Sequence, residues 1–383
     1  MIRIQTTFVT VIAICGTLVL FILYLLLPHS RATYRLPHDE DHLHMHLTPS
    51  FPSTVETQKC ADRGVYNLTY PLTAPEALGG DKLRFRIAVI SDLDTGSKMP
   101  NDDTWLSYLM KGYLTYYLDE EHVEISWDRK RTVLKSSLAV GGRAMELSEL
   151  IVFNGKLYSC DDRSGIIYEI KENQAVPWVI LNDGDGNIAK PFKCEWLAVK
   201  NELMYIGGLG KEWTSSAGEL INFNPQWVKT VSKEGEVRNY NWRNNYLALR
   251  SAAGIQYPGY LIHESSAWST FNKKWYFLPR RASSTAYNDV EDEHKGTNLM
   301  ITSNEQFTDV RVKTVGPVIP THGFSSFKFL PGTNDRIIVA LKSEEDSGHV
   351  ASYITVFTVD GKVLLSEEKV GDASIKYEGI EFV

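Results

Sequence analysis

The fold is predicted by a stretch that reads Leu150-Ile151-Val152-Phe153-Asn154-Gly155-Lys156-Leu157-Tyr158. Two apolar runs flank an Asn-Gly pair, which favours a β-hairpin because both residues tolerate positive φ in a tight turn. Residues 166–170 continue the pattern as a third strand. Similar runs recur at 85–90, 196–199, 203–206, 274–278, 337–341, 353–357 and 363–365. Many short strands indicate a sandwich, barrel or propeller rather than an α/β fold. Asp103 to Tyr117 is the best candidate for a helix.

A weak repeat distinguishes among these all-β folds. A serine or glutamate stands before an apolar strand, and a turn and a second, aromatic-rich strand follow. The repeat begins at Ser148, Glu195, Glu264, Ser325 and Glu378, so the spacings are 47, 69, 61 and 53 residues. This spacing is that of propeller blades, although tight repeats are about 40–50 residues long. We therefore predict an all-β, five-bladed β-propeller whose last strand, ending at Val383, pairs with an early strand and closes the ring.

The repeat also predicts a metal site. If the five innermost strands begin alike, their oxygen-bearing side chains converge on the central channel. Three carboxylates and two hydroxyls around one axis require a cation between them, because the like charges repel. An all-oxygen ring suits Ca²⁺ better than Zn²⁺, which prefers nitrogen and sulfur ligands.

The composition excludes several classes of protein. Of 383 residues, 43% are hydrophobic and 23% are charged, as in a globular chain rather than a disordered or fibrous one. Forty Lys and Arg against 47 Asp and Glu give a net charge of −7, which argues against a nucleic-acid partner. Four cysteines are too few for a disulfide scaffold.

The amino-terminal residues predict a membrane anchor. Residues 8–27 carry no charge, and at about 1.5 Å per residue they are long enough to cross a hydrocarbon core. We expect a cytoplasmic tail at 1–7, a transmembrane signal anchor at 8–27, a Pro-rich lumenal stem at 28–80 and the propeller at 81–383. The alternative is a cleaved signal peptide, whose apolar core is only about 7–15 residues long.

The short tail favours a single-pass type II topology with a lumenal body. The sequon at Asn67, a predicted glycosylation site, also lies beyond the membrane. In an oxidising lumen Cys60, Cys160 and Cys194 form an odd set, which means one pair and a free thiol, or an intermolecular bridge. Cys160–Cys194 is the favoured internal pair, but the sequence does not decide it.

From Arg84 to its end the chain resembles the calcium-activated nucleotidase (apyrase) family. The matching motifs lie at 91–97 (SDLDTGS), 145–150 (MELSEL), 161–165 (DDRSG), 178–186, 193–196 (KCEW), 207–213, 278–283, 321–327 and 376–382. The resemblance implies a five-bladed propeller that holds Ca²⁺ in its tunnel and hydrolyses nucleoside di- and triphosphates such as UDP and GDP. Its calcium ligands map onto Ser148, Glu195, Glu264, Ser325 and Glu378, with Ser326 as an alternative to Ser325.

The resemblance and the anchor together imply the membrane-bound Golgi or endoplasmic reticulum form of the family. In that compartment the enzyme would clear UDP in support of glycosylation. Secretion after cleavage is the alternative, and a homodimer is left open.

Phosphoanhydride hydrolysis also needs a group that orients water and donors for the phosphate oxygens. Asp92 and Asp94 stand two apart at a strand end, so both carboxylates share one face, and Glu146 shares a face with Ser148 in the same way. We expect Asp92, Asp94 or Glu146 to orient the attacking water. The candidate phosphate donors are Arg163, Lys211, Arg280 and Arg281, and Trp213 or Tyr257 could stack on a nucleobase.

Two rival functions come from other classes. A type II anchor, a Pro-rich stem and Asp92-x-Asp94 are also typical of a Golgi glycosyltransferase that holds a metal–UDP complex. That hypothesis requires strands that alternate with helices of 10–15 residues. A non-catalytic propeller that binds glycans or proteins is the second rival, but it would not need converging carboxylates beside Lys211 and Arg280.

Overall fold

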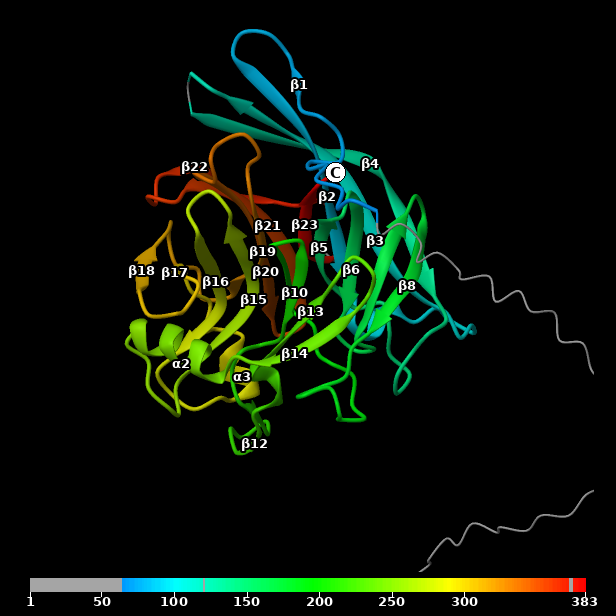
Figure 1. The fold of residues 1–383 in the computed structure, drawn as a ribbon, viewed down its shortest axis with the longest axis vertical. Coiled ribbons are helices and arrows are strands. Elements are labelled where there is room, and N and C mark those ends of the chain that lie inside the picture. The colour runs from blue at the N-terminus through cyan, green and yellow to red at the C-terminus, as the bar shows by residue number, and fades with distance from the viewer. Residues whose placement is uncertain (1–63, 120, 372–374) are drawn as a thin grey trace, which may run out of the picture. The chain divides into compact units, whose positions relative to one another are not determined.

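The computed structural model describes residues 64–119, 121–371 and 375–383, which form a five-bladed, mainly antiparallel β-propeller (Figure 1). From the axis outward, blade 1 contains β23 (Lys376–Phe382), β2 (Lys82–Asp92), β3 (Trp105–Tyr117) and β4 (His122–Ser136), with the short β1 (Glu76–Ala77) also paired to β2. Blade 2 contains β5 (Leu147–Phe153), β6 (Lys156–Asp161), β7 (Ile166–Lys171) and β8 (Gln174–Ile180). Blade 3 contains β9 (Trp196–Lys200), β10 (Leu203–Gly207), β13 (Trp227–Val231) and β14 (Val237–Asn241).

The last two blades are consecutive four-stranded meanders. Blade 4 contains β15 (Tyr260–Ser269), β16 (Lys274–Ser283), β17 (Leu299–Ser303) and β18 (Val310–Thr314). Blade 5 contains β19 (His322–Phe329), β20 (Ile337–Asp346), β21 (His349–Thr358) and β22 (Val363–Lys369). The prediction of a five-bladed propeller is therefore confirmed.

The carboxyl-terminal strand closes the ring, as predicted. β23 pairs antiparallel with β2, and Ile87 faces Phe382 in this ladder while Val89 faces Ile380. Figure 1 shows the red β23 beside the blue β2. Because every residue of β23 is buried, the end of the chain is an innermost strand rather than a free edge.

Apolar side chains fill the spaces between neighbouring blades. β5 is buried at every position, which explains its continuous apolar run, and it packs against β23 and β9 on either side. The Asn-Gly pair between β5 and β6 has φ values of 50° and 67°, so the predicted tight turn is confirmed.

The predicted helix at Asp103 to Tyr117 is wrong, because this segment is the strand β3. Its residues alternate between buried and partly exposed positions, with a local break at Met110, and it pairs with β2 on one side and β4 on the other. The segment contains helix formers such as Leu106, Leu109 and Lys111, but pairing on both edges overrides local propensity.

Helices are few in the described part of the chain. They are α2 (Arg243–Ala252), α3 (Asp289–Asp292) and the 3₁₀ turns Asp94–Ser97 and Asn224–Gln226, and a small hairpin joins β11 (Trp213–Thr214) to β12 (Leu220–Asn222). This arrangement excludes the alternating strands and helices that the glycosyltransferase hypothesis requires. None of the described helices is both long and apolar enough to cross a bilayer.

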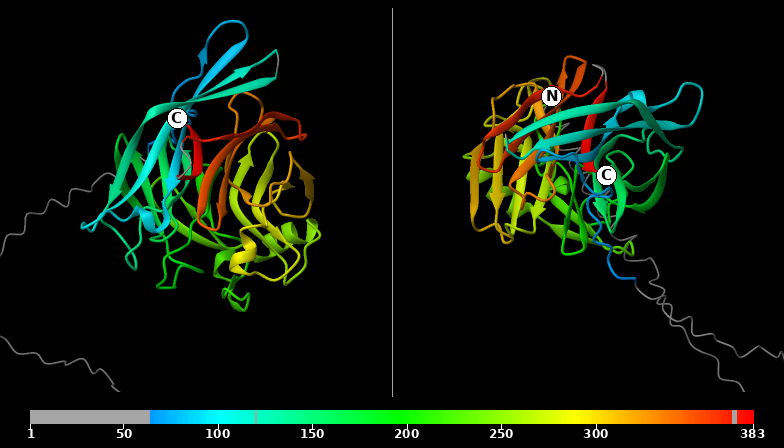
Figure 2. Two further views of the ribbon diagram at one scale, coloured as in Figure 1. Left: turned by 180° about the vertical axis from the view of Figure 1, so that it is seen from behind. Right: turned by 90° about the horizontal axis from the view of Figure 1, so that it is seen from above.

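The predicted tail and anchor lie outside the described residues, as does most of the stem. Residues 64–383 form one compact unit, so the last part of the predicted stem, residues 64–80, belongs to it. The Tyr66 ring packs edge-to-face on Phe153 at 5.5 Å, and the Tyr70 hydroxyl donates to Glu381 Oε1 at 3.1 Å. Figure 2 shows the β1–β2 and β3–β4 ends (blue and cyan) projecting beyond the other blades.

These contacts predict that truncation at 81 destabilises the propeller, whereas truncation at 64 does not. Chain 81–383 loses the contacts of Tyr66 and Tyr70. Its melting temperature should therefore fall by about 2–4 °C for each kcal/mol by which the free energy of unfolding decreases. Chain 64–383 should melt as the full chain does. Calorimetry of the three chains measures this, and Tyr70→Phe in chain 64–383 isolates the hydrogen bond. Equal melting temperatures for both truncated chains would support the boundary at 81.

Candidate active site

A cavity of about 500 Å³ is lined by residues of blades 1, 2, 3, 4 and 5 and of their connections, with the inner strands of blades 1 and 4 among them. Glu195 lines this cavity just before β9, Glu378 near the start of β23, and Glu264 at the irregular middle of β15. Residues near the ends of the same strands, among them Val199, Trp268 and Glu381, line a separate cavity. The three predicted carboxylates are therefore brought together from three blades.

Basic side chains lie between these carboxylates. Arg280 Nη1 is 2.5 Å from Glu264 Oε2 and 2.9 Å from Glu378 Oε1. Lys193 Nζ is 2.6 Å from Glu195 Oε1. Burial raises the pKa of Glu195 to about 8 despite Lys193, and burial also raises the pKa of Glu378. Ionised carboxylates are costly in this position, so a further cation would stabilise them.

The two predicted hydroxyl ligands lack partners. Ser148 Oγ and Ser325 Oγ are buried, and neither has a hydrogen-bond partner among the described residues. Ser326 Oγ instead donates to Glu149 Oε1 at 2.6 Å, which favours Ser325 as the ligand. Buried hydroxyls without partners are rare in native proteins. Two such hydroxyls, at positions that the strand repeat makes equivalent to those of the three glutamates, fit an oxygen-preferring ion such as Ca²⁺.

A second acidic cluster adjoins the tunnel. Carboxylate oxygens of Asp92, Asp94 and Glu146 all lie within 4.8 Å of one another, so these three residues could also hold a metal. Lys376 Nζ, however, is 3.0 Å from Asp92 Oδ2 and 2.9 Å from Asp94 Oδ2. Arg143 and Arg163 both pair with Glu146, at 2.5 and 2.8 Å. The carboxylates of this cluster thus face basic side chains, as Glu195, Glu264 and Glu378 also do, and the predicted ring differs in including two hydroxyls without partners.

Asp94 is the most accessible of the three carboxylates. Its side chain is 45% exposed, whereas that of Asp92 is 5% exposed, and both residues line the cavity. Asp94 has a φ of 48°, and its backbone N–H donates to Asp92 Oδ1 at 2.7 Å, which stabilises this uncommon conformation. Glu146 is fully buried behind Arg163 and is not among the residues that line the cavity.

Lys376, Glu345 and Lys193 are functional candidates that the sequence analysis missed. Lys376 Nζ also lies 2.9 Å from Glu345 Oε1, and Glu345 Oε2 lies 2.6 Å from Arg280 Nη2. Burial acts to raise the pKa of Glu345, but the charges of Arg280 and Lys376 outweigh it and lower that pKa. Lys376 stands two residues before Glu378, so strand alternation alone could have placed it on the face of the ligand.

The predicted phosphate donors all line the same cavity. Arg163, Lys211, Arg280 and Arg281 do so, and Trp213 lines it too, whereas Tyr257 does not. Lys211 Nζ donates to Thr214 Oγ1 at 2.9 Å and lies 4.2 Å from the centroid of the Tyr287 ring. Burial lowers the pKa of Lys211 to about 8, and burial also lowers the pKa of Arg281. A cavity lined with both cations and aromatic rings can accept a ligand that combines phosphates with a planar base.

Deeper in the tunnel, Lys328 occupies a second polar layer. Its ammonium lies 3.1 Å from Glu149 Oε1, and Glu149 is fully buried. Burial raises the pKa of Glu149 to about 7 although Lys328 acts to lower it. Because an internal ammonium already faces this carboxylate, the layer is a poor site for a metal ion.

Comparison with known proteins agrees with this geometry. Residues 93–383 match the apyrase family. The chain is 59% identical over 318 residues to soluble calcium-activated nucleotidase 1 of Rattus norvegicus, covering 83% of this chain and 78% of that protein. It is 48% identical to apyrase apy-1 of Caenorhabditis elegans, covering 78% and 84%, and 42% identical to an apyrase of Cimex lectularius, covering 83% and 87%.

The unpartnered hydroxyls lead to a prediction about calcium binding. The substitution Ser148→Ala or Ser325→Ala removes one of these hydroxyls. It should stabilise the calcium-free protein by about 1–3 kcal/mol, which is the cost of burying an unpaired hydroxyl. The same change should reduce the rise in melting temperature that calcium causes, because a ligand is lost. Differential scanning calorimetry with and without calcium measures both effects.

Ser266→Ala is the matched control. Ser266 Oγ is also buried without a partner, but it lines the separate cavity at the other end of the tunnel. This variant should be stabilised without calcium and should keep the full calcium shift. If all three variants keep that shift, the hydroxyls are not ligands.

Proposed function

Because this chain belongs to the apyrase family and is a calcium-activated nucleotidase, we propose that it hydrolyses nucleoside diphosphates and triphosphates, UDP and GDP included. The products are the lower phosphates and inorganic phosphate, released by direct attack of water. One observation carries this proposal. Three glutamates from three blades converge on a cavity that is lined with cations and with the accessible Asp94, and the strand repeat adds the unpartnered hydroxyls of Ser148 and Ser325.

The calcium ion would be held by Ser148, Glu195, Glu264, Ser325 and Glu378. When bound, such an ion neutralises phosphate charge and polarises the phosphoryl group. The residues fit calcium rather than magnesium because five side chains from five blades cannot easily contract to the tight octahedron that magnesium demands. Asp92, Asp94 and Glu146 supply charge beside the ring, with Glu146 acting through Arg163.

The phosphate chain would lie between two sets of donors. Arg163 is 35% exposed at the cavity, and Lys211 approaches from the β11 side. Arg280 and Arg281 are largely buried in the cavity wall, where Arg280 pairs with Glu264 and both add positive potential. Donors fixed before the substrate arrives stabilise developing charge without reorganisation, which is how such sites lower a barrier.

Asp94 is the best candidate for the group that orients water. It is accessible, it is held by Asp92 and Lys376, and it faces the cavity. A carboxylate in this position can accept a hydrogen bond from the attacking water and receive its proton. On the other side of the cavity, the rings of Trp213 and Tyr287 offer stacking surfaces for the base.

We also propose a lumenal Golgi or endoplasmic reticulum location, with residues 8–27 as a type II anchor. The Cys160–Cys194 disulfide supports an oxidising compartment, and Asn67 is exposed, as a glycosylated residue must be. Clearing UDP there would prevent it from accumulating as a product of glycosyl transfer. The direct test is localisation of the full chain, with sensitivity of the Asn67 glycan to endoglycosidase.

Phosphate release tests the proposed activity. We expect the full chain to release phosphate from UDP, GDP and their triphosphates in calcium, without any sugar acceptor. Magnesium with calcium chelated should support little or no activity. Full activity in magnesium would contradict a calcium ring, and no release from any nucleotide would leave a binding propeller as the better hypothesis.

Two substitutions should separate the metal ring from the group that orients water. Glu195→Gln should weaken calcium binding, and excess calcium should restore part of the rate by mass action. Asp94→Asn should lower turnover by about 10²–10⁴-fold while the thermal shift caused by calcium remains. Asp103→Asn, which removes an exposed carboxylate, is the control and should change neither calcium binding nor turnover. The opposite pattern for Glu195 and Asp94 would reverse the two roles.

A further inference from the structure

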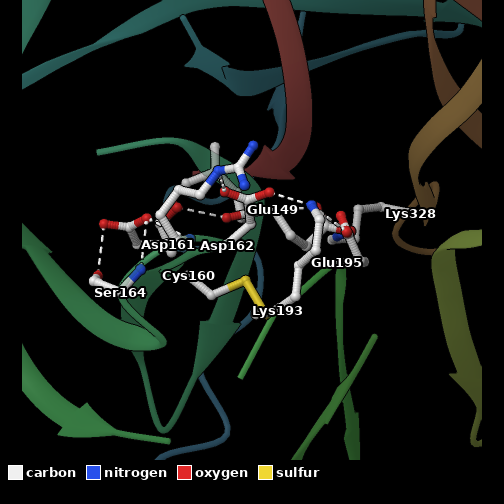
Figure 3. The surroundings of a disulfide bond; sticks show 12 residues. Glu149, Cys160, Asp161, Asp162, Ser164, Lys193, Glu195 and Lys328 are labelled. Carbon is white, nitrogen blue, oxygen red and sulfur yellow. Dashed lines mark hydrogen bonds and ion pairs between the residues drawn. A yellow bond between two sulfur atoms is a disulfide. The ribbon is translucent and has the colours of Figure 1, made fainter. Parts of the chain in front are cut away.

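A disulfide links two blades directly beneath the candidate active site (Figure 3). Cys160 lies near the end of β6 in blade 2, and Cys194 lies just before β9 in blade 3. The pair favoured by the sequence is thereby confirmed. The bond joins residues 34 positions apart, and both cysteines are fully buried. It therefore ties the second strand of blade 2 to the segment that leads into the inner strand of blade 3.

The residues that flank the two cysteines belong to the site. Asp162 lies two residues after Cys160, and Lys193 and Glu195 are the two neighbours of Cys194 in the sequence. Lys193 Nζ contacts both Asp162 Oδ2 and Glu195 Oε1. Figure 3 shows Lys193 reaching toward both carboxylates above the yellow bond. The covalent bond and the ion pairs thus connect the same two segments.

On the blade 2 side, the segment is rigidly held. The buried Asp161 carboxylate accepts hydrogen bonds from the backbone N–H of Met145 at 2.8 Å and of Arg163 at 3.0 Å, and from Ser164 Oγ at 2.7 Å. Met145 lies just before β5, the strand that carries Ser148. This network fixes Cys160 relative to one of the hydroxyls in the ring.

On the blade 3 side, the Glu195 carboxylate has fewer restraints than the Asp161 carboxylate has in blade 2. Glu195 ends the 15-residue connection 181–195 between β8 and β9. Its backbone N–H donates to the Gly207 carbonyl at 2.8 Å, but its Oε1 has only the charge contact with Lys193 and no hydrogen bond of good geometry. The position of this carboxylate therefore depends on the backbone of 193–195, which the disulfide attaches to the rigid blade 2.

We propose that Cys160 and Cys194 are positioning residues for the calcium ring, so that calcium affinity depends on the redox state of their bond. Reduction by a dithiol transfers two electrons and two protons, and it yields two cysteine thiols and an oxidised cyclic disulfide. Once the bond is open, Glu195 and Lys193 are no longer fixed relative to Asp162 and Ser148. The inference rests on the proposed function only in taking Glu195 as a calcium ligand.

The linkage between the bond and the ion is reciprocal. If the closed disulfide favours calcium binding, then bound calcium favours the closed disulfide by the same factor. Calcium should therefore protect the buried bond from a dithiol, which gives a readout that does not depend on activity.

The experiment compares the full chain with its Cys160→Ala/Cys194→Ala variant by calorimetric titration with calcium. We expect the dissociation constant for calcium to rise about tenfold, as is typical when a group that orients a metal ligand is lost. Turnover of UDP should fall at limiting calcium and recover at least in part when calcium is in excess, because mass action compensates for a weaker site. Val356→Ala, a core substitution in blade 5, controls for general loss of stability.

Dithiothreitol treatment of the unmodified chain gives the second measurement and covers the case of a variant that does not fold. Mass spectrometry of alkylated peptides that contain Cys160 and Cys194 follows opening of this bond alone. We expect calcium to slow opening at least fivefold, and magnesium to leave it unchanged. Equal opening rates with and without calcium, or an unchanged calcium dissociation constant in the folded variant, would overturn the proposal.

Glu195→Gln, tested in the oxidised chain, separates this inference from the proposed function. If Glu195→Gln weakens calcium binding but the disulfide-free variant does not, the bond only stabilises the fold. If Glu195→Gln has no effect on calcium binding, the proposed calcium site itself is wrong.

Discussion

Mutual repulsion among carboxylates on the propeller axis is the constraint to which the rest of the site responds. Glu195, Glu264 and Glu378 come from three blades and line one cavity; Glu195 and Glu378 are buried and Glu264 is mostly buried, so their charges are poorly screened. Arg280 and Lys193 lie between them, and Lys376 extends the same network to Asp92 and Asp94. The alternation of acid and base makes the cavity wall a continuous ionic network rather than a set of separate pairs. One more cation changes the balance of charge in such a network, and an enzyme that calcium activates requires a site that responds to the ion in this way.

Closure of the propeller and assembly of the site are the same event. β23 completes blade 1 by pairing with β2, and this single strand also carries Lys376 and Glu378 into the tunnel. Its partner β2 ends at Asp92, so the ladder between the two strands brings Lys376 to the aspartates. A chain that failed to seat its carboxyl terminus would lose an innermost strand, a predicted calcium ligand and the counter-ion of Asp94. Stability and activity therefore depend on the same set of backbone hydrogen bonds.

Some parts of the site were predictable because strands have a simple periodicity. Asp92 with Asp94, and Lys376 with Glu378, stand two apart, and alternation places each pair on one face. The helix predicted at Asp103 to Tyr117 failed for the opposite reason. Leu, Met and Lys in that segment suit either conformation, and only the two neighbouring strands select β3. Lys193 and Glu345 were missed because their partners, Asp162 and Arg280, are 31 and 65 residues away.

The sequence by itself determined the architecture. Short apolar runs, an Asn-Gly turn and five recurrences of an oxygen-bearing residue before a strand were enough to predict five blades and an innermost carboxyl-terminal strand, because hydrophobic periodicity and turn chemistry are local properties. Only the tertiary structure decided which charges face one another. It placed Arg280 between two glutamates, left the hydroxyls of Ser148 and Ser325 without partners, and joined Cys160 to Cys194. These contacts join residues from different blades, and their distances follow from how the blades pack around the axis, which no local pattern encodes.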